Sequence, residues 1–452
     1  MSPQALTTIG TLLSGAVRSE RGRFHIVDRD HLRTRLPALV RVAVFSPDAT
    51  ERHDLQMFLR DVAVASGVVS CSIWRLYHHL AQQPRLTYCV PAFNLRVMTF
   101  DSARALFRAA IAAHAGAFVV EIARSEMDYT DQRPLEFAAV VSAAAVVEGW
   151  RGPLFLQGDH FQVRAKAFAN NPASEQLALK SLINESLDAG FHNIDLDAST
   201  IVDLAQPTVA EQQAQNVNQT ASMAAEIRRY HDGVDPISIG GEVGEVGKEN
   251  TTAHELRAFL GGTADALART SPGQPGLMKV SIQTGSRHGG VVLADGTPGV
   301  MSIDFETIKT LSEVARKEFG LAGVVQHGAS TLPMELYEKF RTSGAVEIHL
   351  STIFQSLVLD HPAFPMDLKA TMKAYVAEHC EHDRNPDDSD AQFWYRMRKK
   401  AVGPFKRQLW GMSDDVRREI MTTLEQRFRL LFHDLGVEKT AADVRHLYSS
   451  RT

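Results

Sequence analysis

The sequence predicts an α/β protein built on a (β/α)8 TIM barrel with helical N- and C-terminal extensions. From Val90 onward, a short apolar strand, a small polar or glycine-rich turn and an amphipathic helix follow one another repeatedly. Strands that alternate with helices indicate a parallel sheet. Eight such units match the size and count of a barrel. An open doubly wound sheet is the competing architecture, and the absence of a GxGxxG fingerprint removes one reason to prefer it.

The barrel strands are expected in eight apolar segments, and helices are expected between them. The expected strands are 90–95, 118–123, 153–160, 193–199, 237–244, 279–285, 323–328 and 345–351. The expected helices are 102–114, 134–148, 174–189, 209–230, 253–268, 305–319 and 333–341. We therefore divide the chain into a mostly helical extension (1–88), the barrel (89–364) and a C-terminal helical appendage (365–452), which should pack on the barrel or on a neighbouring subunit.

Composition favours an ordinary soluble globular protein. The formal charge of −5 and the lack of a basic run with interleaved aromatics argue against nucleic-acid binding. The basic residues of 396–400 (RMRKK) are expected to form one solvated helix face. Three cysteines without metal or redox spacing suit a reducing compartment. No signal peptide and no apolar run of roughly 20 residues is evident, so we expect a cytoplasmic protein without membrane contact.

Residue types that bind metals or move protons stand at the ends of five expected strands. They are the Asp159–His160 pair, Asp195 with Asp197, Glu242, His288 and His327. Strand ends of a parallel barrel meet at one face, where ligands bind. Imidazoles with a carboxylate nearby suit zinc or another divalent ion, with a position left open for substrate. Each residue alone is more often a surface or structural residue than a ligand, so their common position carries the argument.

Two glycine-rich segments lie beside these residues. Backbone N–H groups of 285–290 (GSRHGG) and 327–330 (HGAS) could approach an anion, and barrels often bind phosphate after strands seven and eight. The alternative is that the glycines only serve tight turns. The segment 240–247 (GGEVGEVG) is interpreted as a loop that passes close to a ligand or to a moving element.

These motifs together resemble the class II, metal-dependent fructose- and tagatose-bisphosphate aldolases. The resemblance covers about residues 90–359 and rests on AFN (92–94), GDH (158–160), DLDAS (195–199), GEVGEVG (241–247), RHGG (287–290) and HGAS (327–330). It implies a reversible retro-aldol cleavage of a ketose phosphate. A divalent ion on the C2 carbonyl and C3 hydroxyl oxygens would stabilise the enediolate as a Lewis acid.

The resemblance also implies residue roles. Zinc would be bound by His160, His288 and His327, with Glu242 as an alternate or outer ligand. Asp159 would be the acid/base at the C4 hydroxyl, and Asp197 would support the metal site. Substrate and its phosphate would contact the remaining site residues, Asn94, Gly289, Gly328, Ser330, Ser351 and Thr352. Aldolases of this kind are usually dimers or tetramers, so we expect a homo-oligomer.

The substrate-recognition residues depart from the family pattern. The Asn-x-Asp-Thr-Asp segment expected after the last strand is here 349–353 (HLSTI), in which only Thr352 is retained. A Ser expected after the second strand is Ala123, Lys248 replaces a common Gly, and a Lys expected after RHGG is Val291 or Val292. The candidate metal ligands of the family are retained, whereas the residues expected to contact substrate differ from the family pattern. This favours a substrate other than fructose 1,6-bisphosphate.

Two further hypotheses remain. The GDH segment, the DLDAS segment followed by PTVAEQ (207–212) and the helical tail are similar to those of non-catalytic partner subunits of tagatose-bisphosphate aldolases. A different barrel metalloenzyme, such as a sugar isomerase or hydrolase, would also fit a cluster of this kind.

Overall fold

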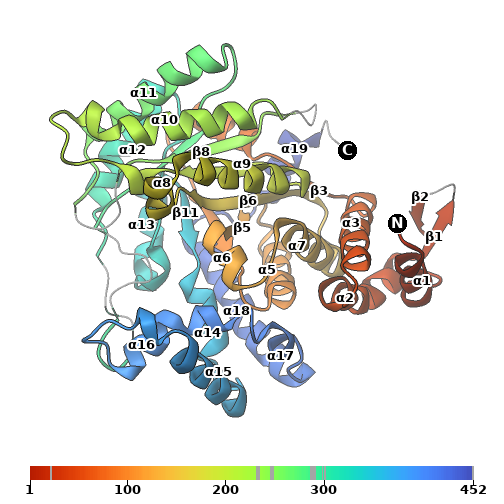
Figure 1. The fold of residues 1–452 in the computed structure, drawn as a ribbon. Coiled ribbons are helices and arrows are strands. Elements are labelled where there is room, and N and C mark those ends of the chain that lie inside the picture. The colour runs from red at the N-terminus through yellow and green to blue at the C-terminus, as the bar shows by residue number, and fades with distance from the viewer. Residues whose placement is uncertain are drawn as a thin grey trace.

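The computed structural model describes residues 1–20, 23–230, 235–244, 249–285, 292–297, 299 and 302–449. Its centre is a closed parallel barrel, in which the strand order β4-β5-β6-β7-β8-β9-β10-β11 is completed by pairing of β11 with β4 (Figure 1). Closure confirms the predicted barrel and excludes an open sheet. The strands are β4 (Val90–Asn94), β5 (Val119–Ala123), β6 (Gly152–Gln162), β7 (Asn193–Asp197), β8 (Ser238–Glu242), β9 (Lys279–Ile282), β10 (Val324–Gln326) and β11 (Ala345–Leu350).

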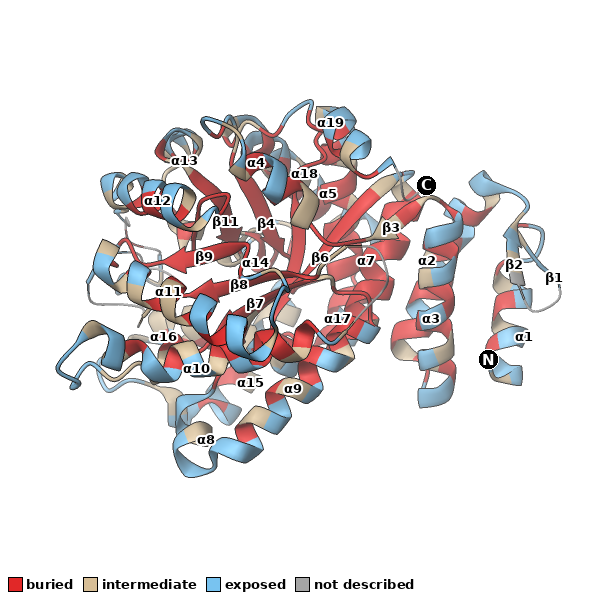
Figure 2. Cartoon of the chain, turned by 90° about the horizontal axis from the view of Figure 1, so that it is seen from above, coloured by how far each residue is buried: buried red, intermediate tan, exposed pale blue. Residues whose placement is uncertain are grey.

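Helices cover the outside of the barrel. The ones that follow strands β4 to β11 are α5 (Thr99–Ala113), α6 (Arg124–Tyr129), α7 (Pro134–Glu148), α8 (Ala165–Asn170), α9 (Pro172–Asp188), α10 (Val209–Ile227), α11 (Ala253–Thr270), α12 (Phe305–Phe319), α13 (Tyr337–Ser343) and α14 (Thr352–Leu359). Figure 2 shows the buried strands at the centre and exposed residues on the outward faces of α9, α10, α11 and α12. Capping boxes begin α10 at Thr208 and α11 at Thr252, which fixes where both helices start.

The N-terminal extension packs beside the barrel and closes one end of it. It contains α1 (Pro3–Leu12), the hairpin β1 (Val17–Glu20) and β2 (Arg23–Ile26), α2 (Arg29–Phe45), α3 (Ala49–Ala65), β3 (Val68–Ser70) and α4 (Trp74–Ala81). Strand β3 pairs in parallel with the start of β6. From α4, the buried Tyr77 hydroxyl donates to Glu347 inside the barrel. Helix α4 therefore lies at the end of the barrel opposite the carboxyl ends of the strands, whereas α2 and α3 pack at the side against α7.

The C-terminal segment contributes to both the wall and the mouth of the barrel. It forms α15 (Met366–His379), α16 (Asp390–Met397), α17 (Lys406–Trp410), α18 (Asp414–Asp434) and α19 (Ala441–Leu447). Helix α18 packs on α5, and its Phe428 and Phe432 contact Phe93 of β4 with ring centroids 5.2 and 5.5 Å apart. Burying these rings stabilises the segment by about 1.5–3 kcal/mol per side chain.

No helix among the described residues is both long and apolar enough to span a bilayer.

Candidate active site

Strand β6 carries the central GDH segment on a bulge. Its pairing with β7 shifts register between Gly158 and Phe161. A Cβ atom at Gly158 would lie 2.4 Å from the Phe161 ring, so the position requires glycine. His160 has a φ of 39°, a left-handed conformation that is unfavourable for a residue with a side chain. Such bulges and strained residues redirect side chains next to active sites.

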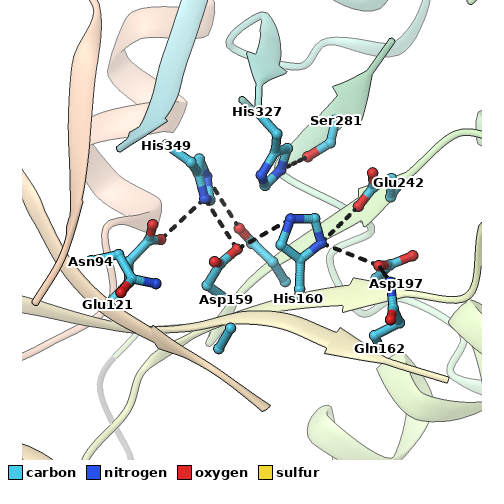
Figure 3. A network of polar contacts seen from close by, with 12 residues as sticks. Asn94, Glu121, Asp159, His160, Gln162, Asp197, Glu242, Ser281, His327 and His349 are labelled. Atoms are coloured by element: carbon cyan, nitrogen blue, oxygen red, sulfur yellow. Dashed lines mark hydrogen bonds and ion pairs between the residues drawn. The ribbon is translucent and has the colours of Figure 1, made fainter. Parts of the chain in front are cut away.

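The bulge places His160 among carboxylates from three strands (Figure 3). Its Nδ1 atom lies 3.1 Å from Asp197 of β7 and 3.1 Å from Glu242 of β8. Its Nε2 atom lies 3.8 Å from Asp159. The ring centroid of His327, just after β10, is 4.1 Å from that of His160. Of the residues predicted to converge, Asp159, His160, Asp197, Glu242 and His327 therefore lie together.

Burial and charge shift the pKa values of this cluster. Burial, with the nearby Asp197 charge, raises the pKa of Glu242 to about 7. The pKa of Asp197 is lowered, because hydrogen bonds from His160, Ser199 and Gln162 outweigh its burial. The pKa of His160 is raised well above its usual value, since Asp159 and Glu242 outweigh the opposing effect of burial. Carboxyl groups that are this crowded favour a bound cation.

Most of the predicted substrate-binding residues line one cavity, and Asn94 contacts a residue of its lining. Gly328, Ser330, Ser351 and Thr352 line a cavity of about 360 Å³ at the barrel mouth, together with Asp159, His160 and His327. Within that lining, Ser330 Oγ accepts a hydrogen bond from the Ser351 N–H at 2.9 Å. Asn94 is buried and donates to Glu126, which itself lines the cavity. His288 and Gly289 lie outside the described residues.

Sequence reasoning missed His349, which lies on β11 beside the cluster. Its ring centroid is 4.0 Å from that of His327, and its Nδ1 atom lies 3.1 Å from both Asp159 and Glu121. The sequence comparison treated His349 only as a departure from an expected Asn. The alternation of VEIHL was the available signal, because it directs Glu347 and His349 to the same side of a strand.

Most of a polar layer inside the barrel was missed as well, since only Asp195 of this layer was among the predicted residues. Lys279 of β9 lies 2.9 Å from Asp195, contacts Glu347 and donates to Gln157 at 2.7 Å. Gln157 in turn donates to Glu121 at 2.9 Å. Each of these residues interrupts an apolar strand, and buried charges of this kind are found where they are paired or bind an ion.

The donor groups fit a divalent ion. His160, Glu242 and His327 offer ligand atoms that all lie within 4.8 Å of one another. Buried carboxylates around them outnumber the one lysine of the layer: Glu121, Asp159, Asp195, Asp197, Glu242 and Glu347. Burial and the Asp159 charge also raise the pKa of Glu121 to about 7. Two imidazoles, a carboxylate and an excess of negative charge are the chemistry of a zinc-type site.

The C-terminal segment closes one side of the cavity through Tyr395, Arg396 and Lys399. The prediction that 396–400 form one solvated helix face is wrong. Arg398 is 1% exposed and donates to Asp360 and Ser356 at 2.5 and 2.6 Å, which ties this turn to α14. The prediction failed because the side chains of a basic run are usually solvated, whereas here each basic side chain contacts a different neighbouring residue.

Comparison with known proteins gives the family. The profile of the family "Fructose-bisphosphate aldolase class-II" matches residues 76–403. This chain belongs to that family, as the sequence motifs predicted. Comparison with curated proteins gave no significant match.

Solved structures share the fold at low sequence identity. Fructuronate-tagaturonate epimerase UxaE from Cohnella laeviribosi is 12% identical, with a TM-score of 0.52 over 98% of this chain and 100% of that one. A "probable tagatose 6 phosphate kinase" from Sinorhizobium meliloti is 15% identical, with a TM-score of 0.53 over 80% and 100%. A fructose-bisphosphate aldolase from Campylobacter jejuni is 16% identical, with a TM-score of 0.49 over 82% and 97%.

Proposed function

We propose that this protein is a metal-dependent aldolase that cleaves a ketose phosphate other than fructose 1,6-bisphosphate. Membership of the class II aldolase family supports a lyase of this type. The observation that carries the proposal is the placement of Asp159, which lines the cavity between His160 and His349. A carboxylate held beside candidate metal ligands is what acid/base catalysis of carbon–carbon cleavage requires.

Asp159 would exchange a proton with the C4 hydroxyl of the substrate. Loss of that proton breaks the C3–C4 bond, and the electron pair passes toward the C2 carbonyl to give an enediolate. A divalent ion, when bound, supplies Lewis-acid stabilisation of this charge. His160, His327 and Glu242 would hold the ion, with His288 added by the family resemblance. Asp197 would keep His160 oriented through its hydrogen bond at 3.1 Å.

The cavity is suited to an anionic substrate. Arg96 lies 2.5 Å from Glu126 and reaches toward the Thr352 hydroxyl at 3.5 Å. Lys399 lies over the Tyr129 ring and makes no ion pair with any described residue. Arg96 and Lys399 together outnumber the one carboxylate of Glu126, which leaves a positive charge on the wall of the cavity that includes Thr352. This charge supports a phosphate or carboxylate on the substrate.

Product analysis tests the proposal. The zinc-loaded protein is incubated with a panel of phosphorylated ketoses, and release of dihydroxyacetone phosphate or of an aldehyde fragment is measured. Asp159→Asn should reduce the turnover number by at least about 10²-fold while zinc remains bound. The matched control is Asp203→Asn, a partly exposed loop carboxylate that does not line the cavity, which should have no effect. The proposal fails if the loaded wild type cleaves none of the panel. The acid/base cluster gives no support to a purely structural subunit.

Epimerisation of a ketohexuronate is the second candidate function. Similarity to the Cohnella epimerase extends over 98% of this chain and so includes both extensions, and the C-terminal extension closes the cavity. Fructose- and tagatose-type sugars differ in configuration at C4. If the C3–C4 bond is cleaved and the aldehyde fragment stays bound, the enediolate can add back to the opposite face of that aldehyde. This inverts C4 and converts one sugar type into the other. Incubation with fructuronate distinguishes the candidates, because an epimerase would give tagaturonate and release no fragment.

A further inference from the structure

We propose that His349 is a metal ligand, and that together with Asp159 and His327 it forms an ion position separate from the one formed by His160, Glu242 and His327. The inference deepens the proposed function by assigning a residue to its metal centre. Ligand atoms of Asp159, His327 and His349 all lie within 4.8 Å of one another, and all three residues are buried.

The surroundings of His349 are those of a metal-bound imidazole. Its Nε2 atom lies 2.6 Å from Glu347, and its Nδ1 atom faces Asp159 at 3.1 Å (Figure 3). Histidine ligands in metal sites commonly donate the other ring N–H to a carboxylate, which fixes the tautomer and the ring orientation. Glu347 occupies that position and is itself held by Lys279. The ring is therefore oriented so that Nδ1 can bind an ion.

The nearby charges also favour an ion at this point. Asp159 and Glu121 each have a carboxylate oxygen 3.1 Å from Nδ1. Lys279 instead lies on the Nε2 side, where it neutralises Glu347 and Asp195. A divalent ion at Nδ1 would add positive charge directly beside these two carboxylates.

The two ligand sets share His327, so each chain would bind one ion and not two. The ring of His327 lies between the other two, with centroids 4.1 Å from His160 and 4.0 Å from His349. The Nε2 atom of His327 also lies 2.8 Å from Ser281 Oγ. One shared imidazole makes the two positions alternatives for the same ion.

Cobalt titration of variants tests this assignment without substrate or turnover. His160→Gly removes one imidazole of the first ligand set, and glycine accepts the φ of 39° at this residue. We expect His160→Gly to bind one Co²⁺ per chain with a visible absorption spectrum. Adding His349→Ala should weaken Co²⁺ binding at least tenfold and change that spectrum. The control H160G/H361A removes a half-buried histidine that hydrogen-bonds Thr423 outside the cavity, and it should bind like His160→Gly.

The inference is overturned if His160→Gly binds no Co²⁺, or if H160G/H349A binds it as tightly as His160→Gly with an unchanged spectrum. Circular dichroism and thermal unfolding establish that each variant is folded. Failure of the proposed function would be a separate result. The wild type would then cleave no ketose phosphate, whereas the cobalt titration would still show whether His349 binds the ion.

Discussion

The ammonium group of Lys279 lies 2.9 Å from the Asp195 carboxylate, and this ion pair crosses over the backbone of Gly240 inside the barrel. The two residues belong to β9 and β7, which are separated by β8. A side chain on β8 at this level would occupy the space that the ion pair needs. The charged layer below the metal ligands therefore depends on a glycine in the intervening strand.

Substituting Gly240 by Ala should destabilise the protein. Its Cβ would lie 2.3 Å from Asp195 Oδ1 and 3.1 Å from the Lys279 side chain, both buried. We expect a loss of about 1–3 kcal/mol in the free energy of unfolding, measured by urea denaturation. Gly261→Ala in α11 is the control, because its Cβ meets nothing within 4 Å. It should stabilise the helix by about 0.5–1 kcal/mol. Equal stabilities of the two variants would contradict the account of the charged layer.

The pair Glu136–Lys406, which joins the C-terminal segment to α7, should give a defined pH dependence. The two groups lie 2.6 Å apart, yet burial outweighs the lysine and raises the pKa of Glu136 to about 6. A carboxyl whose folded pKa is raised binds its proton more tightly when folded. Its contribution to stability is thus full below pH 4.5 and is lost as pH rises through about 6.

Urea denaturation of wild type and Glu136→Gln between pH 4 and 7.5 measures this contribution. The wild type should lose about 2 kcal/mol relative to the variant across that range. Glu185→Gln, which removes a carboxylate paired with Arg133 at the surface, is the control and should follow the wild-type curve. Parallel curves for wild type and Glu136→Gln would show that this group does not titrate in that interval.

The strands could be predicted from sequence because each is a short apolar run with a polar end. Helices α7 and α12 were predicted to the residue, since Pro134 and Asp304 mark their starts and Gly149 and Gly320 their ends. The carboxyl end of β6 could not be predicted. Its bulge depends on the Phe161 ring packing against Gly158, which is a contact in three dimensions.

His349 and Lys399 were missed for a related reason. A charged residue in an apolar strand or in a basic run has no local pattern that reveals its partner. The position of His349 depends on β11 closing the barrel next to β4, and that of Lys399 on Arg398 being buried against α14. Both are consequences of tertiary packing between segments that are distant in sequence.

Removing the cation of Lys399 should weaken substrate binding more than it slows the reaction. Lys399 lines the cavity, and burial together with the nearby Arg96 charge lowers its pKa. An anionic substrate would relieve the repulsion between Lys399 and Arg96 equally in the bound ground state and in the transition state. Removing the lysine should therefore change substrate binding and leave turnover unchanged. With an anionic ketose that the wild type accepts, Lys399→Met should raise KM at least tenfold and leave kcat within about twofold.

Two variants separate a charge effect from a folding effect at Lys399. Lys399→Arg should restore most of the affinity. Lys400→Met removes the next residue, which pairs with Asp383 and does not line the cavity, and should leave KM unchanged. A wild-type KM in Lys399→Met, or an equal rise in Lys400→Met, would exclude Lys399 from substrate binding.

His160 should show a trade-off between function and stability. Its φ of 39° costs about 1–2 kcal/mol for a residue with a Cβ, whereas glycine adopts this conformation without penalty. His160→Gly should therefore be more stable than His160→Ala by about 1 kcal/mol in urea denaturation of the metal-free protein. Both variants lose the same imidazole, so the contacts to Asp197 and Glu242 cancel in the comparison. Equal stabilities would mean that the bulge relaxes when the side chain is removed. A more stable glycine variant would show that the strained backbone conformation persists without the imidazole and is therefore a property of the bulge itself.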